Sequence, residues 1–88
     1  MVIPVDEGAR KEAFSIVNKL RSEQIAADMD LTNRSFKGQM RKAGKEAREF
    51  IILIGEDEIK SGKLILKNME TSEQEALTVE EIIERLKG

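Results

Sequence analysis

Three carboxylates follow the most apolar stretch of the chain. Residues 50–54 (FIILI) run without a polar residue into Gly55, and Glu56, Asp57 and Glu58 come next. Neighbouring carboxylates can transfer protons, hold a divalent cation, or accept hydrogen bonds from the Watson–Crick edge of an unstacked guanine. They can equally form a solvated loop after a buried strand. No second group of carboxylates lies at a spacing that would indicate a catalytic pair or a metal site, so we favour RNA recognition over catalysis.

A second set of charged residues has helical spacing. Phe36, Met40, Ala43 and Ala47 predict the apolar face of a helix. Cations dominate the opposite face, with Lys42 at its side and only Glu46 offsetting them: Arg34, Lys37, Arg41, Lys45 and Arg48. Such a face can follow nucleic-acid phosphates, and it is also what the outer side and C-terminal dipole of an ordinary amphipathic helix favour. Phosphate contacts would show as a salt-dependent affinity, with a slope of roughly −0.7 to −0.9 per contact.

Composition removes several classes of chemistry. The 88 residues contain no cysteine and no histidine, which excludes disulfides, thiol nucleophiles, the usual zinc ligands and histidine bases. Tryptophan and tyrosine are also absent, and we expect the three phenylalanines to lie in the core, so base recognition would depend on polar and charged side chains. The formal net charge of −2 argues against indiscriminate nucleic-acid binding. No apolar run is long enough to span a membrane.

The charged side chains need a sheet and helices to position them. Apolar patterns predict strands at 2–5, 25–29, 50–54, 64–69 and 74–77, and helices near 7–22, 33–48 and 79–87. Residues 56–63 are predicted to be a loop and turn, and 70–73 a hairpin turn. Because Pro4 cannot donate a ladder hydrogen bond, we expect the first strand either to tolerate a gap there or to begin abruptly. We therefore expect a three-layer α/β domain with a mixed five-stranded sheet and three helices, in the order β-α-β-α-β-β-β-α, with its crevice at the carboxyl ends of the parallel strands.

Three helix starts carry capping signals. Asp6 is placed to cap the first helix, and either Asn33 or Ser35 the second. Thr78 and Glu81 form the sequence signature of a capping box, with Leu77 and Ile82 placed for a hydrophobic staple.

Three segments together resemble a known family. Residues 30–40 (DLTNRSFKGQM), 50–58 (FIILIGEDE) and 62–71 (GKLILKNMET) are similar, in order and spacing, to the C-terminal anticodon-binding domain of class II aminoacyl-tRNA synthetases, most of all histidyl-tRNA synthetase. The resemblance covers nearly the whole chain. It departs from the family pattern at Gln24, Asn33 and Ala47-Arg48, where glycine, glycine and glycine-alanine are common.

The resemblance implies specific roles for residues. Glu58 and Lys67 match positions that contact anticodon bases, and we expect them to stand side by side at the rim of the sheet. Arg34, Lys37, Arg41 and Lys45 would dock the RNA backbone. Weaker candidates for base or backbone contact are Asn33, Ser35, Asn68 and Gln74.

The resemblance also implies partners. The 88 residues would be a single domain cut from a longer cytoplasmic, homodimeric histidine–tRNA ligase, monomeric when isolated, that binds the GUG anticodon loop of tRNA-His. The domain would be non-catalytic and need no cofactor, since ATP and Mg²⁺ belong to the parent's catalytic domain. The alternative is a protein-interaction or regulatory module of a non-charging paralogue, using an acidic surface near the end of the chain: Glu70, Glu73, Glu75, Glu80, Glu81 and Glu84, offset by Arg85 and Lys87.

Overall fold

The computed structural model describes residues 1–30 and 35–87. Its sheet has four strands in the order β1-β2-β3-β4, with β1 (Val2–Pro4) parallel to β2 (Phe50–Ile54). The next two strands, β3 (Leu64–Asn68) and β4 (Gln74–Leu77), are each antiparallel to the preceding one. The mixed α/β architecture is as predicted, and the hairpin turn lies between β3 and β4 as expected.

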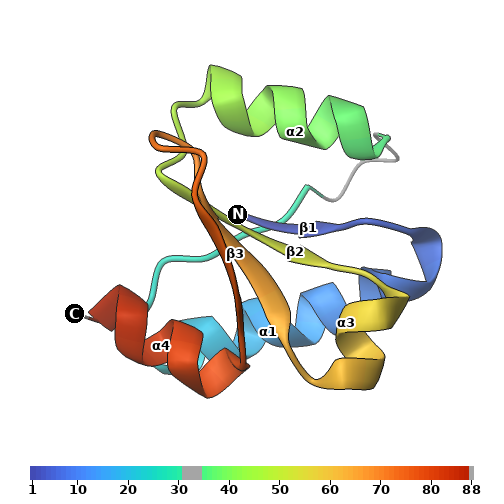
Figure 1. Cartoon of the computed structure of the whole chain (residues 1–88), viewed down its shortest axis with the longest axis vertical. Coiled ribbons are helices and arrows are strands. Elements are labelled where there is room, and N and C mark those ends of the chain that lie inside the picture. Colours follow the sequence, from blue (N-terminus) through green and yellow to red (C-terminus); the bar gives the residue numbers. More distant parts are fainter. Residues whose placement is uncertain (31–34, 88) are drawn as a thin grey trace.

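Helices cover the sheet on both faces. Figure 1 shows α2 (Phe36–Lys45) on one side, and α1 (Arg10–Ser22) and α4 (Val79–Lys87) on the other. A 3₁₀ turn, η1 (Glu7–Ala9), leads into α1, and α3 (Glu56–Ser61) follows β2. The described residues thus form four α-helices, where the sequence predicted three.

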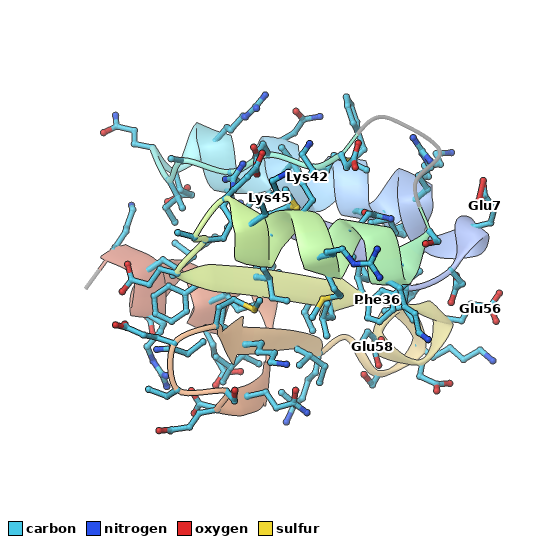
Figure 2. The ribbon with its side chains drawn as sticks, turned by 90° about the horizontal axis from the view of Figure 1, so that it is seen from above. Glu7, Phe36, Lys42, Lys45, Glu56 and Glu58 are labelled. Atoms are coloured by element: carbon cyan, nitrogen blue, oxygen red, sulfur yellow. The ribbon has the colours of Figure 1, made fainter. Side chains whose placement is uncertain are left out.

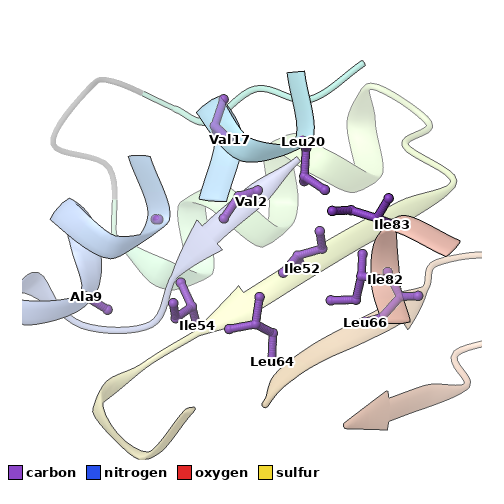
Figure 3. Close-up of a cluster of buried hydrophobic side chains, with 11 residues drawn as sticks. Val2, Ala9, Val17, Leu20, Ile52, Ile54, Leu64, Leu66, Ile82 and Ile83 are labelled. Atoms are coloured by element: carbon purple, nitrogen blue, oxygen red, sulfur yellow. The ribbon is translucent and has the colours of Figure 1, made fainter. Parts of the chain in front are cut away.

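The two faces of β2 belong to two separate cores, because successive strand side chains point to opposite sides. Ile52 and Ile54 pack with residues of α1 and α4, such as Leu20 and Ile82 (Figure 3). Ile51 packs instead with Ile3 and Ala43 under α2. Burial on both faces explains the uninterrupted apolar run of β2 and confirms the prediction made from it.

The predicted fifth strand at 25–29 is wrong. This segment does lie beside β1, since the Val2 amide donates to the Asp28 carbonyl at 2.8 Å, but it forms no strand. Met1, Ile3 and Val5 direct their backbone hydrogen-bonding groups toward β2. The backbone groups of Val2 and Pro4 therefore point away from β2, toward residues 25–29. Because Pro4 has no N–H, the second hydrogen bond along this outer edge cannot form.

The predicted loop after β2 is also wrong, because residues 56–61 form α3. Glu56, Asp57 and Glu58 occupy its first turn, where acidic groups are favoured by the helix dipole. At the other end, Gly62 adopts a left-handed φ of 78° and its amide donates to the Glu58 carbonyl at 2.9 Å.

The predicted second helix is too long. It ends at Lys45, because Ala47 turns away with a φ of 55°. Consequently Ala47 is exposed instead of lying on the apolar face, and Arg48 is not on the helix. The expectation of three core phenylalanines is wrong for Phe14, whose side chain on α1 is 52% exposed.

The three predicted caps are present. Asp6 accepts from the Ala9 amide at 3.0 Å, and Ser35, the second of two candidates, accepts from the Gly38 amide at 3.1 Å. Thr78 and Glu81 form the reciprocal capping box. In the described part of the chain, no helix has the length and apolarity needed to cross a bilayer.

Candidate nucleic-acid interface

Among the described residues, no helix covers the β3–β4 half of the sheet on the side of α2 (Figure 1). Cross-strand register places Ile65 and Lys67 of β3 opposite Leu53 and Ile51, and Ala76 and Gln74 of β4 opposite Ile65 and Lys67. All of these side chains therefore share the face on which α2 packs over β1. Figure 2, viewed from the side of α2, shows the helix over the first half of the sheet and the orange strands beside it. We call Ile65, Lys67, Gln74 and Ala76 the open strand face.

Lys67 and Gln74 form the polar part of the open strand face. They stand directly opposite each other, with Lys67 half-buried and Gln74 exposed. Within residues 1–30 and 35–87, neither side chain has a hydrogen-bond or ion-pair partner. The ammonium of Lys67 donates only, whereas the amide of Gln74 can donate and accept. Both are thus available to the edge of a nucleobase.

Asn68 lies on the other face of the sheet. It pairs with Phe50, whose side chain packs with the α1–α4 core. Its Oδ1 accepts from the amides of Glu70 at 2.9 Å and Thr71 at 3.2 Å, which shapes the β3–β4 hairpin. The structure therefore gives Asn68 a turn-forming role and separates it from Lys67 and Gln74.

Glu58 closes the open strand face at its far end. Its Oε1 lies 3.0 Å from the point where a Cβ on Gly55 would stand. Gly55 continues β2 with an extended φ of −134°, so this point is on the same face as Ile51 and Leu53. Glu58 is half-buried, and among the described residues its carboxylate has no hydrogen-bond or ion-pair partner.

The expectation that Glu58 and Lys67 stand side by side is wrong. Lys67 is opposite Ile51, whereas the Glu58 carboxylate lies over Gly55, four residues further along β2. At about 3.3 Å per residue, this spacing is roughly 13 Å. The two side chains therefore start from opposite ends of one face instead of from neighbouring positions.

Cations of α2 border the open strand face. Gly44 lines a surface hollow together with Met69, which follows β3, so the flank of α2 that bears Gly44 faces β3. Arg41 and Lys37 lie three and seven residues before Gly44 and share that flank. Lys37, Arg41 and Lys45 are exposed, and none makes an ion pair within the described ranges. Figure 2 shows Lys42 and Lys45 together on the side of α2 away from the orange strands.

The other residues predicted for the basic surface lie outside the described residues or make contacts within the fold. Asn33 and Arg34 lie outside the described residues. The oxygen of Ser35 is the helix cap, which leaves its hydroxyl proton able to donate. Arg48 does not belong to the surface, because it pairs with Asp28 at 2.6 Å and with Glu46 at 3.1 Å.

Several cations elsewhere are held by carboxylates. The hydrogen bond from Arg48 to Asp28 raises the pKa of the guanidinium, and Glu46 adds to this effect. Glu75 likewise raises the pKa of Arg85, with which it forms an ion pair, and Lys87 lies 3.1 Å from Glu23. These pairs neutralise three cations outside α2, whereas Lys37, Arg41 and Lys45 have no carboxylate partner among the described residues.

The acidic end of the chain is partly engaged within the fold. Glu75 forms its ion pair with Arg85, and the carboxylate of Glu81 accepts from the Thr78 amide at 2.9 Å. This use of two of the six glutamates weakens the case for a dedicated acidic docking surface. Among the described residues, no cluster of histidine, cysteine, aspartate or glutamate could hold a metal ion.

The fold and the sequence both match one family. The model of the anticodon binding domain family matches residues 1–88. This chain belongs to the anticodon binding domain family. The histidine–tRNA ligase of Acetivibrio thermocellus is 41% identical over 86 residues, which are 98% of this chain and 21% of that protein. That of Listeria monocytogenes serotype 4b is 41% identical over 85 residues, 97% of this chain and 20% of that protein.

Solved structures agree with this membership. Apo histidyl-tRNA synthetase from Staphylococcus aureus superposes with a TM-score of 0.86 at 33% identity, covering 99% of this chain and 22% of that one. The RNA binding domain of threonyl-tRNA synthetase from Cryptosporidium parvum has a TM-score of 0.89 at 22% identity, over 98% and 22%, and shows the same fold. This anticodon binding domain thus spans about one fifth of the length of its curated relatives.

Sequence reasoning missed one residue of this anticodon binding domain. Asp6 was predicted as a helix cap, but its second oxygen also accepts from the Glu56 amide at 3.3 Å, across 50 residues of sequence. No local pattern signals that contact. The run of a glycine, three acidic residues and a second glycine at position 62 could have indicated the short helix itself.

Proposed function

We propose that this domain binds the anticodon stem-loop of a tRNA, specifically tRNA-His with the anticodon GUG, as the non-catalytic part of a histidine–tRNA ligase. The longer protein would be a cytoplasmic homodimer that attaches histidine to its tRNA using ATP, and the isolated domain would be monomeric. The observation that carries the proposal is the open strand face, where polar groups and neighbouring α2 cations have no side-chain partner among residues 1–30 and 35–87.

The α2 cations would position the RNA without reading its sequence. Lys37 and Arg41 border the open strand face and Lys45 extends the cationic surface along the helix, so a loop backbone that follows α2 places its bases over β3 and β4. Arg34 would extend this surface at the start of the helix. The apolar side chains of Ile65 and Ala76 provide a floor on which splayed bases can lie.

The two ends of the open strand face would read different nucleotides. The Glu58 carboxylate can accept from the N1–H and N2–H₂ groups of one guanine, and the Lys67 ammonium can donate to O6 and N7 of another. Gln74, opposite Lys67, can complete the second contact. An anticodon with two guanines separated by one uracil suits two readers roughly 13 Å apart.

Fluorescence-anisotropy titration with stem-loops tests the proposal. We expect the GUG loop to bind more tightly than loops in which either guanine is replaced by adenine. Lys67→Gln should reduce that preference by roughly 5-fold to 100-fold at one position only, because a good bidentate base contact contributes about 1–3 kcal/mol.

The matched control is Lys19→Gln, which removes one exposed cation from α1 on the other side of the sheet. It should leave the base preference unchanged. If Lys67→Gln weakened all loops by one common factor, Lys67 would contact phosphate only. If the wild-type domain did not distinguish the loops, anticodon reading by this domain would be refuted.

A further inference from the structure

One carboxylate joins the starts of two helices. Asp6 follows β1 and caps η1 with Oδ1, which accepts from the Ala9 amide at 3.0 Å. Its other oxygen, Oδ2, accepts from the amide of Glu56, the first residue of α3, at 3.3 Å. Asp6 therefore ties the end of β1 to the element that follows β2.

The helix α3 depends on this external acceptor. Its N-cap residue is Gly55, which has no side chain to satisfy the free amides of the first turn. With only six residues, α3 has little intrinsic stability, so its orientation must come from contacts with the rest of the fold. Among the described residues, Asp6 supplies the side-chain acceptor for that first turn.

The same carboxylate lies close to the proposed base reader. A Cβ on Gly55 would stand 3.0 Å from Glu58 Oε1, 3.3 Å from Asp6 Oδ2 and 3.4 Å from the Val5 Cβ. The Glu58 side chain thus folds back over the hydrogen of Gly55, in space that any larger residue would fill. Since Glu58 lacks a described partner of its own, its direction is set by the orientation of α3 and by this space.

We propose that Asp6 is a positioning residue: its second hydrogen bond orients α3, and together with the open space at Gly55 it directs the Glu58 carboxylate toward the open strand face. The inference rests on the proposed function, in which Glu58 reads a guanine. It assigns base specificity to a residue that contacts no RNA and lies 52 positions before the reader in the sequence.

The test variant is Asp6→Asn. Asparagine caps a helix as well as aspartate does, so the shorter bond to Ala9 survives, while its amide nitrogen cannot accept from Glu56. Glu7→Gln is the matched control, because it removes an equal charge from the neighbouring exposed residue. Gly55→Ala is a second variant. Its extended backbone accepts alanine, but the new Cβ would stand 3.0 Å from Glu58 Oε1 and 3.3 Å from Asp6 Oδ2, so these carboxylates would have to shift.

The free protein gives the first readout. We expect Asp6→Asn to speed hydrogen exchange at the Glu56 amide by roughly 5-fold, the loss expected for one hydrogen bond. The ¹³C signal of the Glu58 carboxyl should move in Asp6→Asn and in Gly55→Ala but not in Glu7→Gln. A Glu58 signal unchanged in both test variants overturns the inference, whatever the RNA does.

The second readout is base preference, measured as the ratio of dissociation constants for loops with guanine or adenine at the position defined by Glu58→Gln. If Glu58→Gln lowers this ratio about 10-fold, Asp6→Asn and Gly55→Ala should lower it at least 3-fold, with Glu7→Gln unchanged. If Glu58→Gln lowers this ratio but neither Asp6→Asn nor Gly55→Ala does, the positioning role is refuted and the proposed function stands. If Glu58→Gln has no effect, Glu58 reads no base and the inference fails with that part of the proposal.

Discussion

Salt dependence gives a quantitative test of how the α2 surface acts. The perturbation is the double substitution Lys37→Gln and Arg41→Gln, which removes the two cations on the flank of α2 that faces β3. Both are exposed, and neither makes an ion pair among the described residues, so the change breaks no described contact that stabilises the fold. Its effect should therefore appear in RNA binding alone.

The magnitude follows from the number of contacts. Phosphate contacts from Lys37, Arg41 and Lys45 predict a slope of log K against log salt of roughly −2.1 to −2.7 for the wild type. The double variant should keep roughly −0.7 to −0.9. A fourfold rise in salt would then weaken wild-type binding by about 20-fold to 40-fold and the variant by only about 3-fold. A contact from Arg34 would add equally to both slopes and leave their difference unchanged.

Anisotropy titrations at four or five salt concentrations measure both slopes. The matched control is Lys11→Gln with Lys19→Gln, which removes two exposed cations from α1 on the opposite side of the sheet. The control should keep the wild-type slope. Equal slopes for the wild type and the α2 variant, or a loss of slope in the α1 control, would refute the assignment of the phosphate contacts to α2.

Three further predictions concern the fold. Hydrogen bonds from Thr78 lower the pKa of Glu81. The contribution of Glu81 to stability is therefore complete above the usual glutamate pKa of about 4.3 and is lost as the pH falls through the lower pKa of the folded state. The melting temperature of Glu81→Gln should accordingly approach that of the wild type in acid, and a difference that stays constant with pH would contradict this. Gly62→Ala should cost about 1–2 kcal/mol in urea unfolding, because φ is 78° there, and a neutral result would rule out the left-handed cap. Ile51→Val and Ile52→Val should each cost about 1 kcal/mol, since both faces of β2 are covered; a loss at only one would show an open face.

Sequence patterns predicted the parts of this fold that depend on local chemistry. The apolar run of β2 requires cover on both faces, and the capping box of Thr78 and Glu81 lies within four residues. Ser35 caps its helix through the Gly38 amide three residues later. These features were recognisable because each cause lies beside its effect in the chain.

The predictions that were wrong concern features that depend on contacts between residues distant in the sequence or on the direction of a backbone group. The predicted strand at 25–29 does not form because the backbone of Pro4, which has no N–H, points toward this segment. That orientation follows only from the pairing of β1 with β2. Similarly, α3 depends on an acceptor from Asp6, 50 residues earlier. The separation of Glu58 from Lys67 is set by the antiparallel register of β3, which the sequence alone does not specify.

In the proposed function, one face of the sheet, bordered by α2, binds the RNA loop. Backbone amide NMR of the domain, titrated with the GUG stem-loop, tests it most directly. We predict chemical-shift changes that saturate together at Lys37, Arg41, Glu58, Lys67 and Gln74, with little change along α1 and α4. Changes centred on α1 and α4, or on Asn68 without Lys67, would place the RNA on the other face and contradict the account.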